Sequence, residues 1–367
     1  MNISRGFPTT LESARKPGVY PLVSPAQPII SDEFYKIFFL CTMPCIQFFN
    51  VAGIITNIIN IVVFVKLGRA ESTNISFQAL AICDLVLSVL SVWTFTSTSL
   101  RLSTVSLPFE PYSVAILTGS GLWNFVVRWG ALITAYISLE RCLCILKPLK
   151  VKRILTPKVT TVAVMVMLVL TVGPALYLHI KYKFVWEAVP PLNKTILVVI
   201  RIKTSEVLLL GAVVNTFAGL MQPIAAFVTV VVCTVYLGIY LERASAWRRE
   251  TSSTAAHTVK TPGKGTQEET STSQKEQRVI RMVISIAVVF IVCLTPSTVH
   301  IFIMGIFPQF SFDAQYANIF NTMFILSCLG SSVNASVNIF IYHRMGSRYK
   351  TTFRQIFRIR DKDSTSN

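Results

Sequence analysis

The stretch ITAYISLERCLCILKPLKVKR, residues 133–153, begins as an apolar helix and ends in a run of lysine and arginine. At the changeover, Glu140 and Arg141 place an acid and a base side by side. A helix that crosses a membrane needs about 20 mostly apolar residues, and positively charged residues favour the cytoplasmic side. We therefore interpret this stretch as the cytoplasmic end of a membrane-spanning helix, with an ion pair at its edge.

The rest of the chain repeats this apolar pattern. Of its 367 residues, 52% are hydrophobic and 14% are charged, and its mean hydropathy is +0.58. In a soluble protein of this length, about a quarter of the residues are normally charged. The stretches long enough to span a membrane cover residues 38–66, 75–99, 112–146, 157–179, 207–241, 278–304 and 315–342. We predict an all-α membrane protein, a seven-transmembrane helix bundle over residues 38–342.

The net charge of +17 differs between the two sides of the predicted bundle. About two thirds of the 34 Lys and Arg lie in the segments after the first, third and fifth spans and in the C-terminal tail. This asymmetry predicts an extracellular N-terminus and a cytoplasmic C-terminus, and it accounts for the basic excess without a nucleic-acid partner. The sequons at Asn2 and Asn193 fall on the predicted outer side, where we expect glycosylation.

The segments outside the spans have distinct compositions. Residues 1–37 are rich in Pro and Ser and predict a flexible extracellular N-terminus, and the polar segment 242–277 predicts a disordered cytoplasmic loop. Within residues 180–206, two β-prone runs flank a turn sequence. They predict a hairpin that is either part of a ligand site or a basic lid without that role. In the cytoplasmic tail, residues 343–367, an amphipathic basic helix over 346–358 suits the anionic lipids of the inner leaflet.

Polar side chains within the spans are costly and therefore indicate function. Asp84 and Asn338 fall at similar depths, which predicts a hydrogen-bonded or ion-binding network between them. A sodium ion near Asp84 and a static contact between helices are both open alternatives. Further polar residues of the spans to which we assign a role are Asn57, Arg128, Asn334 and Tyr342. Pro223 and Pro296 each remove a helical hydrogen bond and predict kinks, and a kinked sixth span suits a mechanical switch.

Several short motifs follow one another along the spans in a characteristic order. They are Gly53 with Asn57, LAICD ending at Asp84, Glu140-Arg141-Cys142, Pro223, FIVCLTP ending at Pro296, and NIFIY at 338–342. Together with seven spans, they resemble the rhodopsin-like family of G-protein-coupled receptors over nearly all of residues 38–358. The resemblance implies a plasma-membrane receptor that binds an extracellular ligand and acts on a heterotrimeric G protein, with arrestin as a further partner.

The resemblance also implies a role for the pair at the end of the third span. Glu140-Arg141-Cys142 looks like the family's Asp-Arg-Tyr motif, with Glu in place of Asp and Cys in place of Tyr. At rest, Arg141 is expected to pair with Glu140 and to reach Glu276 at the foot of the sixth span. When that span swings outward, Arg141 is expected to meet the G protein. The remaining switch residues implied by the family are Phe290, Pro296, Asn338 and Tyr342.

Departures from the family pattern bear on the ligand. Ile339 replaces a proline, Leu294 replaces a tryptophan, and the large outer loop lacks the family's cysteine. These changes indicate a divergent branch that loosely resembles orphan neuropeptide or chemosensory receptors of invertebrates. The residues expected to form the ligand pocket are Trp93, Trp123, Arg128 and Glu206. We expect Arg128 to pair with an acidic-ended peptide or a small carboxylate, with Glu206 as an alternative, internal partner.

A membrane transporter or channel is the competing class of function. Transporters often contain repeated halves, whereas here seven spans give an odd count and the sequence has no evident internal repeat. We do not expect an enzyme, because no HExxH or paired acid motif accompanies the histidines. The eight cysteines lack the spacing of metal ligands, so we expect no metal site and no cofactor apart from the sodium ion considered above.

Overall fold

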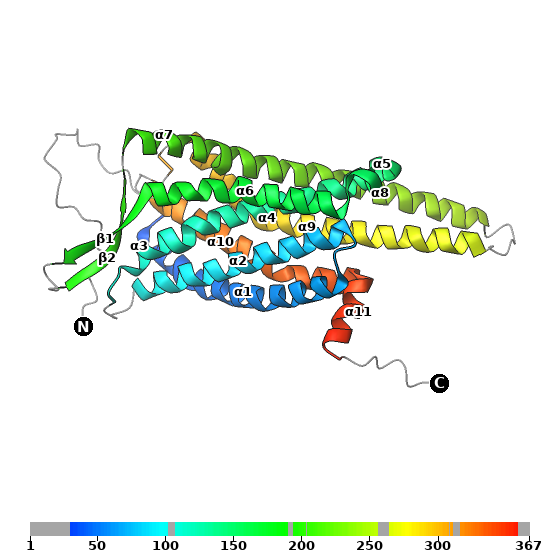
Figure 1. Ribbon diagram of the computed structural model, residues 1–367, viewed down its shortest axis with the longest axis horizontal. Coiled ribbons are helices and arrows are strands. Elements are labelled where there is room, and N and C mark those ends of the chain that lie inside the picture. The colour runs from blue at the N-terminus through cyan, green and yellow to red at the C-terminus, as the bar shows by residue number, and fades with distance from the viewer. Residues whose placement is uncertain are drawn as a thin grey trace.

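The computed structural model describes residues 30–101, 107–189, 194–202, 204–255, 264–307, 309–310 and 316–358. Within these residues, seven helices are long and apolar enough to cross a membrane (Figure 1). In chain order the spans are α1 (Asp32–Leu67), α2 (Ser72–Arg101), α3 with η1 and α4 (Pro111–Ala115, Ile116–Ser120 and Gly121–Leu146), α6 (Pro157–Lys181), α7 with η3 and α8 (Ser205–Val214, Asn215–Met221 and Gln222–Ala255), α9 (Lys264–Ile306) and α10 (Ala317–Met345). The predicted all-α bundle of seven spans is confirmed.

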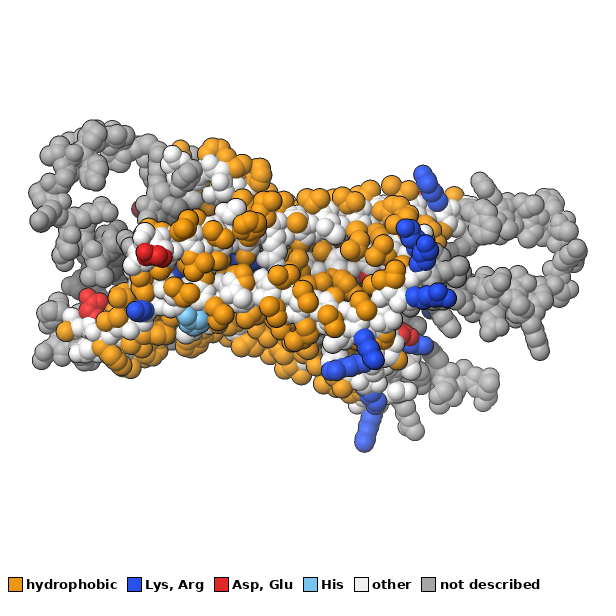
Figure 2. Space-filling view, turned by 45° about the horizontal axis from the view of Figure 1, so that its top comes forward, with side chains coloured by type: hydrophobic (Ala, Val, Ile, Leu, Met, Phe, Trp, Pro, Cys, Tyr) orange, Lys and Arg blue, Asp and Glu red, His pale blue; other side chains and the backbone are white. Residues whose placement is uncertain are grey.

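Shorter elements distinguish the two ends of the bundle. One end carries the strands β1 (Tyr182–Val189) and β2 (Lys194–Arg201), and the other carries α5 (Pro148–Ile154) and α11 (Ser347–Ile356) (Figure 1). We call them the hairpin end and the α11 end. Figure 2 shows a broad band of hydrophobic side chains between the ends and most of the visible Lys and Arg gathered at the α11 end. The short helix predicted after the last span is confirmed as α11.

The hairpin predicted within residues 180–206 is confirmed, since β1 and β2 pair antiparallel with Tyr182 opposite Arg201. Leu197 of β2 also donates its N–H to the carbonyl of Pro108 at 3.0 Å and accepts from the N–H of Glu110 at 2.9 Å. All eight cysteines are free thiols. Backbone pairing therefore joins the hairpin to the segment that leads into the third span.

A π-helical segment precedes the predicted kink at Pro223. At the end of η3, the N–H of Gln222 bonds to the carbonyl of Phe217, five residues back. This wider turn moves the preceding carbonyls away from the proline ring, which would otherwise clash with them. The turn also lies against the third span, because a Cβ atom added to Gly219 would be 3.7 Å from the Nη2 atom of Arg128.

The segment 242–277, predicted as disordered, is helical at both of its ends. α8 continues to Ala255, and α9 already begins at Lys264. The prediction is wrong for these extensions because they contain no proline and are rich in Glu, Gln, Lys, Arg and Ala. Such residues favour helix, and lengthening an existing helix avoids the cost of nucleation.

Several predictions concern residues outside the described part of the chain. Asn2 lies in residues 1–29 and Asn193 lies in residues 190–193, so glycosylation of both stays a prediction. The same holds for the flexible N-terminus over most of its length and for residues 256–263 of the predicted loop.

Candidate functional site

The ion pair at the α11 end of the third span is held by the second span. Glu140 is buried, with 2% of its side chain exposed, and its Oε1 atom accepts from the Nη2 atom of Arg141 at 3.0 Å. The same Oε1 atom accepts from the hydroxyl of Ser72 at 2.6 Å, and Oε2 accepts from Ser76 at 3.5 Å. Arg141 also donates to the hydroxyl of Thr73. A buried carboxylate is tolerated when charge and hydroxyl donors compensate it, as they do here.

Sequence reasoning did not identify the hydroxyl groups of α2 that contact the ion pair. Ser72, Thr73 and Ser76 lie in the first turns of α2 and face the end of α4. Their spacing places them on one side of a helix. Ser and Thr at a helix start are usually read as capping residues, so only the packing of α2 on α4 identifies them as partners of Glu140 and Arg141.

The sixth span carries the other predicted switch residues. Glu276 belongs to α9, but its side chain lies outside the described ones, so its contact with Arg141 stays a prediction. Pro296 lies inside α9, and Phe290 is buried one and a half turns before it, with its ring centroid 6.4 Å from that of Phe227 in α8. Phe290 therefore lies where α9 packs against α8.

Asp84 and Asn338 do meet, as the sequence suggested. The Nδ2 atom of Asn338 donates to the Oδ2 atom of Asp84 at 2.9 Å, and both side chains are buried. The Oδ1 atom of Asn338 and the hydroxyl of Tyr342 have no hydrogen-bond partner among the described residues. Asn334 lines a small cavity beside Asp84. Asp84 and Asn338 thus join α2 to α10, beside two polar atoms that make no hydrogen bond among the described residues.

Asn57 belongs to a separate set of hydrogen bonds. Its Nδ2 atom donates to the carbonyls of Gly53 at 2.9 Å and Ala335 at 2.8 Å, while its Oδ1 atom accepts from Asn60 at 3.2 Å. The Oδ1 atom of Asn60 accepts from the hydroxyl of Tyr349 at 2.6 Å. These contacts form a continuous path from α11 through α1 to α10.

Sequence reasoning missed two parts of this path, Asn60 and the hydroxyl of Tyr349. The pattern of apolar residues in 346–358 indicated a membrane-facing side chain, yet Tyr349 is only 3% exposed. Its ring packs against Phe64 and Tyr342 at centroid distances of 5.4 and 5.6 Å. Burial raises the pKa of Tyr349 above that of an exposed tyrosine, which keeps the hydroxyl neutral and able to donate.

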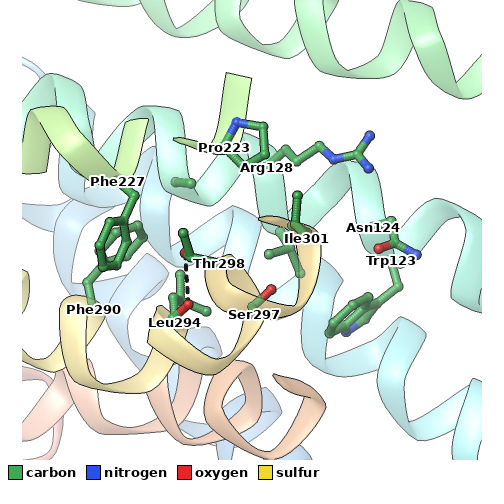
Figure 3. Close-up of a pocket in the computed structure, with 12 residues that line it drawn as sticks. Trp123, Asn124, Arg128, Pro223, Phe227, Phe290, Leu294, Ser297, Thr298 and Ile301 are labelled. Atoms are coloured by element: carbon green, nitrogen blue, oxygen red, sulfur yellow. Dashed lines mark hydrogen bonds between the residues drawn. The ribbon is translucent and has the colours of Figure 1, made fainter. Parts of the chain in front are cut away.

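A pocket opens between the third, fifth and sixth spans (Figure 3). Its lining includes Trp123, Asn124 and Arg128 of α4, Pro223 and Phe227 of α8, and Phe290, Leu294, Ser297, Thr298 and Ile301 of α9. Figure 3 shows Phe227 and Phe290 facing each other at one end of the pocket and Trp123 with Asn124 at the other. Trp123 also packs edge to face against Phe324 of α10, at a centroid distance of 6.1 Å.

Two residues predicted for the pocket lie elsewhere. Trp93 is 40% exposed, and its Nε1 atom donates to the hydroxyl of Thr118 in η1 at 2.8 Å, which turns the ring away from the pocket. Glu206 is exposed in the first turn of α7 and does not line the pocket. An acid at that place interacts favourably with the helix dipole without any contact to Arg128. Trp123 and Arg128 thus line this pocket and Trp93 and Glu206 do not, while a part in ligand binding stays a prediction for all four.

Seven apolar spans with an ion pair buried at one end and a pocket nearer the other define a multi-pass membrane protein with the architecture of a receptor. A family model described as 7 transmembrane receptor (rhodopsin family) matches residues 56–342. The match covers more than half of the chain, so the chain belongs to the rhodopsin family of seven-transmembrane receptors. A comparison with curated proteins found no match.

Proposed function

We propose that this receptor binds an extracellular ligand at the pocket and activates a heterotrimeric G protein by outward movement of α9. The hairpin end faces the outside and the α11 end faces the cytoplasm, in the plasma membrane. The concentration of Lys and Arg at the α11 end supports this orientation, because positive residues favour the cytoplasmic side. Rhodopsin-family receptors are generally not enzymes, in keeping with this proposal.

The observation that carries the proposal is the held ion pair. Arg141 is fixed by Glu140 of its own helix and by Thr73 of α2, at the end of the bundle that would receive a G protein. Charge-assisted hydrogen bonds of this kind contribute about 1.5–3 kcal/mol each, which holds a side chain but can be overcome by a partner. In the active state, Arg141 exchanges these contacts for the G protein, and the resting contact with Glu276 is broken when α9 moves.

The ligand changes this equilibrium by binding the active arrangement more tightly. Phe290, Leu294 and Thr298 bring one side of the pocket onto α9, on both sides of Pro296. A ligand in contact with them acts directly on the helix that moves. We infer an acidic-ended peptide or a small acidic chemosensory molecule, in line with a divergent neuropeptide or chemosensory receptor.

Further partners follow from the same orientation. Anionic lipids of the inner leaflet contact α11, where Arg348 is exposed, and the exposed Arg358 that follows the helix. Arrestin binds at the α11 end once the receptor is active. A sodium ion binds near Asp84, since its carboxylate and the side chains of Ser331 and Asn334 line one cavity and supply the oxygen ligands that hard cations prefer.

Basal G-protein activation in cells, normalised to surface expression, tests the proposal. Glu276→Ala should raise basal signalling above wild type, because it removes a resting contact, and Arg141→Ala should abolish signalling. If wild type and both variants are silent at equal surface levels, the receptor proposal fails. Net substrate flux into liposomes then tests the transporter alternative.

A further inference from the structure

Arg128 is a half-buried cation for which the described residues supply neither an acidic partner nor a hydrogen-bond acceptor. It lies in α4, nearer the hairpin end than Arg141, and is largely covered by neighbouring side chains. Its guanidinium carbon lies 5.0 Å from the centre of the Phe125 ring. Among the described residues, no carboxylate forms an ion pair with it and no oxygen accepts a hydrogen bond from it.

An unpaired charge in this position is costly. Even a hydrogen-bonded polar group is expensive within a membrane span, and a guanidinium offers five N–H donors that need acceptors. Arg141 in the same helix has its partners supplied by Glu140 and Thr73, whereas within the described part of the chain Arg128 has the ring of Phe125 and no charged or hydrogen-bonding partner. The protein therefore keeps a destabilising group at its pocket, as proteins do where a ligand completes the site.

The remaining lining determines what kind of anion fits. The walls are aromatic and aliphatic, with Trp123, Phe227, Phe290, Leu294 and Ile301 among them. Asn124, Ser297 and Thr298 supply neutral polar groups, and none of the described residues that line the pocket is acidic. A single anionic group on a flat apolar body matches one guanidinium inside such walls, whereas a cationic ligand meets repulsion and no counter-charge.

We propose that the pocket binds a small monocarboxylate with an aromatic or otherwise flat apolar body, and that its carboxylate forms a bidentate pair with Arg128. A planar guanidinium matches a carboxylate in this way, and each charge-assisted hydrogen bond is stronger than a neutral one. The location of the ligand rests on the proposed receptor function, while the charge pairing rests on the contacts of Arg128 alone. The C-terminal carboxylate of a peptide is the competing ligand, and a peptide needs a wider entry to the pocket than a small acid.

The first experiment needs no ligand. Arg128→Met keeps an apolar chain of similar length and removes the unpaired charge, so the purified, ligand-free variant should melt a few degrees above wild type. Arg141→Met is the matched control, because it removes a paired arginine from the same helix and should melt below wild type. If Arg128→Met also melts below wild type, Arg128 is a structural residue with a partner, and the proposal is overturned.

The second experiment measures binding by thermal stabilisation of the purified receptor. The probes are benzoate, 3-phenylpropanoate, indole-3-acetate and octanoate at millimolar concentration, beside 3-phenylpropanamide, 3-phenylpropylamine and a tetrapeptide that ends in phenylalanine. We expect at least one acid to stabilise wild type, and the amide and the amine to do so at least about 10-fold more weakly. Arg128→Met should lose the effect, whereas Arg201→Met, which removes an arginine of the hairpin, should keep it.

The outcomes separate this inference from the proposed function. No stabilisation by any of the acids, equal stabilisation by the amide, or stabilisation by the tetrapeptide alone overturns the small-carboxylate pocket. Stabilisation by an acid that depends on Arg128 but never activates a G protein supports the pocket and contradicts the proposed signalling. Signalling by Arg128→Met in response to other ligands supports the proposed signalling and contradicts the small-carboxylate pocket.

Discussion

Removing a single hydroxyl group tests whether α11 is joined to the bundle by the Tyr349–Asn60 contact. In Tyr349→Phe, the ring that packs against Phe64 and Tyr342 remains, and only the donor to Asn60 is lost. The Oδ1 atom of Asn60 is then buried without this partner, because Asn60 is 0% exposed. Leaving a buried acceptor unpaired costs about 1–3 kcal/mol.

Tyr342→Phe is the matched control. Tyr342 is equally buried in the same aromatic cluster, but its hydroxyl has no hydrogen-bond partner among the described residues. Its removal should be neutral or slightly stabilising, since no bond is lost and a buried polar atom disappears. The two variants thus differ in chemistry only by whether the lost hydroxyl had an acceptor.

Thermal unfolding of the purified receptor and hydrogen exchange of α11 are the assays. At about 2–4 °C per kcal/mol for domains of 150–250 residues, Tyr349→Phe should lower the melting temperature by several degrees. It should also speed exchange in residues 347–356, and Tyr342→Phe should do neither. Equal melting temperatures for the two variants would refute the idea that the hydroxyl, rather than the ring, holds α11.

The effect of pH provides a second check on the same residue. Burial raises the pKa of Tyr349 in the folded state, while an exposed tyrosine ionises near a pH of about 10. The neutral form is therefore favoured by folding, and its contribution is complete below that pH and lost as the pH rises further. The stability of wild type should fall more steeply than that of Tyr349→Phe in this alkaline range.

The remaining predictions concern other helix contacts. Gly330→Ala should prevent folding or destabilise the protein strongly, because its Cβ atom would lie 2.0 Å from the carbonyl oxygen of Cys293. Gly173→Ala should be tolerated, since nothing lies within 4 Å of its Cβ atom. Surface expression and melting temperature measure both effects. Ser72→Ala should lower the stability by about 1–3 kcal/mol and raise basal signalling, because it removes a donor to buried Glu140. Unchanged signalling would show that this contact of α2 does not hold the resting state. Leu197→Pro should speed hydrogen exchange in residues 107–115, because it removes the N–H that reaches Pro108, while Leu197→Val should leave exchange unchanged.

The sequence predicts the fold well because membrane spans are signalled by composition alone. Apolar runs and the positions of Lys and Arg required no knowledge of packing, and the hairpin followed from β-prone runs around a turn. The helical extensions on both sides of residues 256–263 were missed, since a polar composition indicates exposure and does not exclude helix. Ser72 and Asn60 were missed for another reason. Their role depends on which helix faces them, and hydrophobicity within one helix carries no information about that.

The site predictions likewise depended on whether the packing between helices had to be known. Asp84 and Asn338 were paired correctly because motifs placed both at one depth, whereas Asn57 bonds instead to Ala335 of α10 and to Asn60, which in turn contacts α11. Trp93 was expected in an aromatic, basic pocket, yet its indole donates to Thr118 and it does not line the pocket. Depth in a membrane can be counted along the sequence, but the side of the helix that meets a given neighbour cannot.

Under the proposed function, Arg128 pairs with the ligand and Arg141 meets the G protein, and the energies show why the ligand must also contact α9. Shifting a two-state equilibrium from about 1:99 to 99:1 requires about 5.5 kcal/mol of differential binding. A charged pair on Arg128 supplies about 1.5–3 kcal/mol per hydrogen bond, and only the part that differs between the two states counts. If that part is about 3 kcal/mol, the remaining 2.5 kcal/mol or so corresponds to burial of about 100 Å² of apolar surface that only the active state provides. Phe290, Leu294 and Ile301 are the α9 side chains that can provide it, so a carboxylate with no apolar body should bind at Arg128 without activating the receptor.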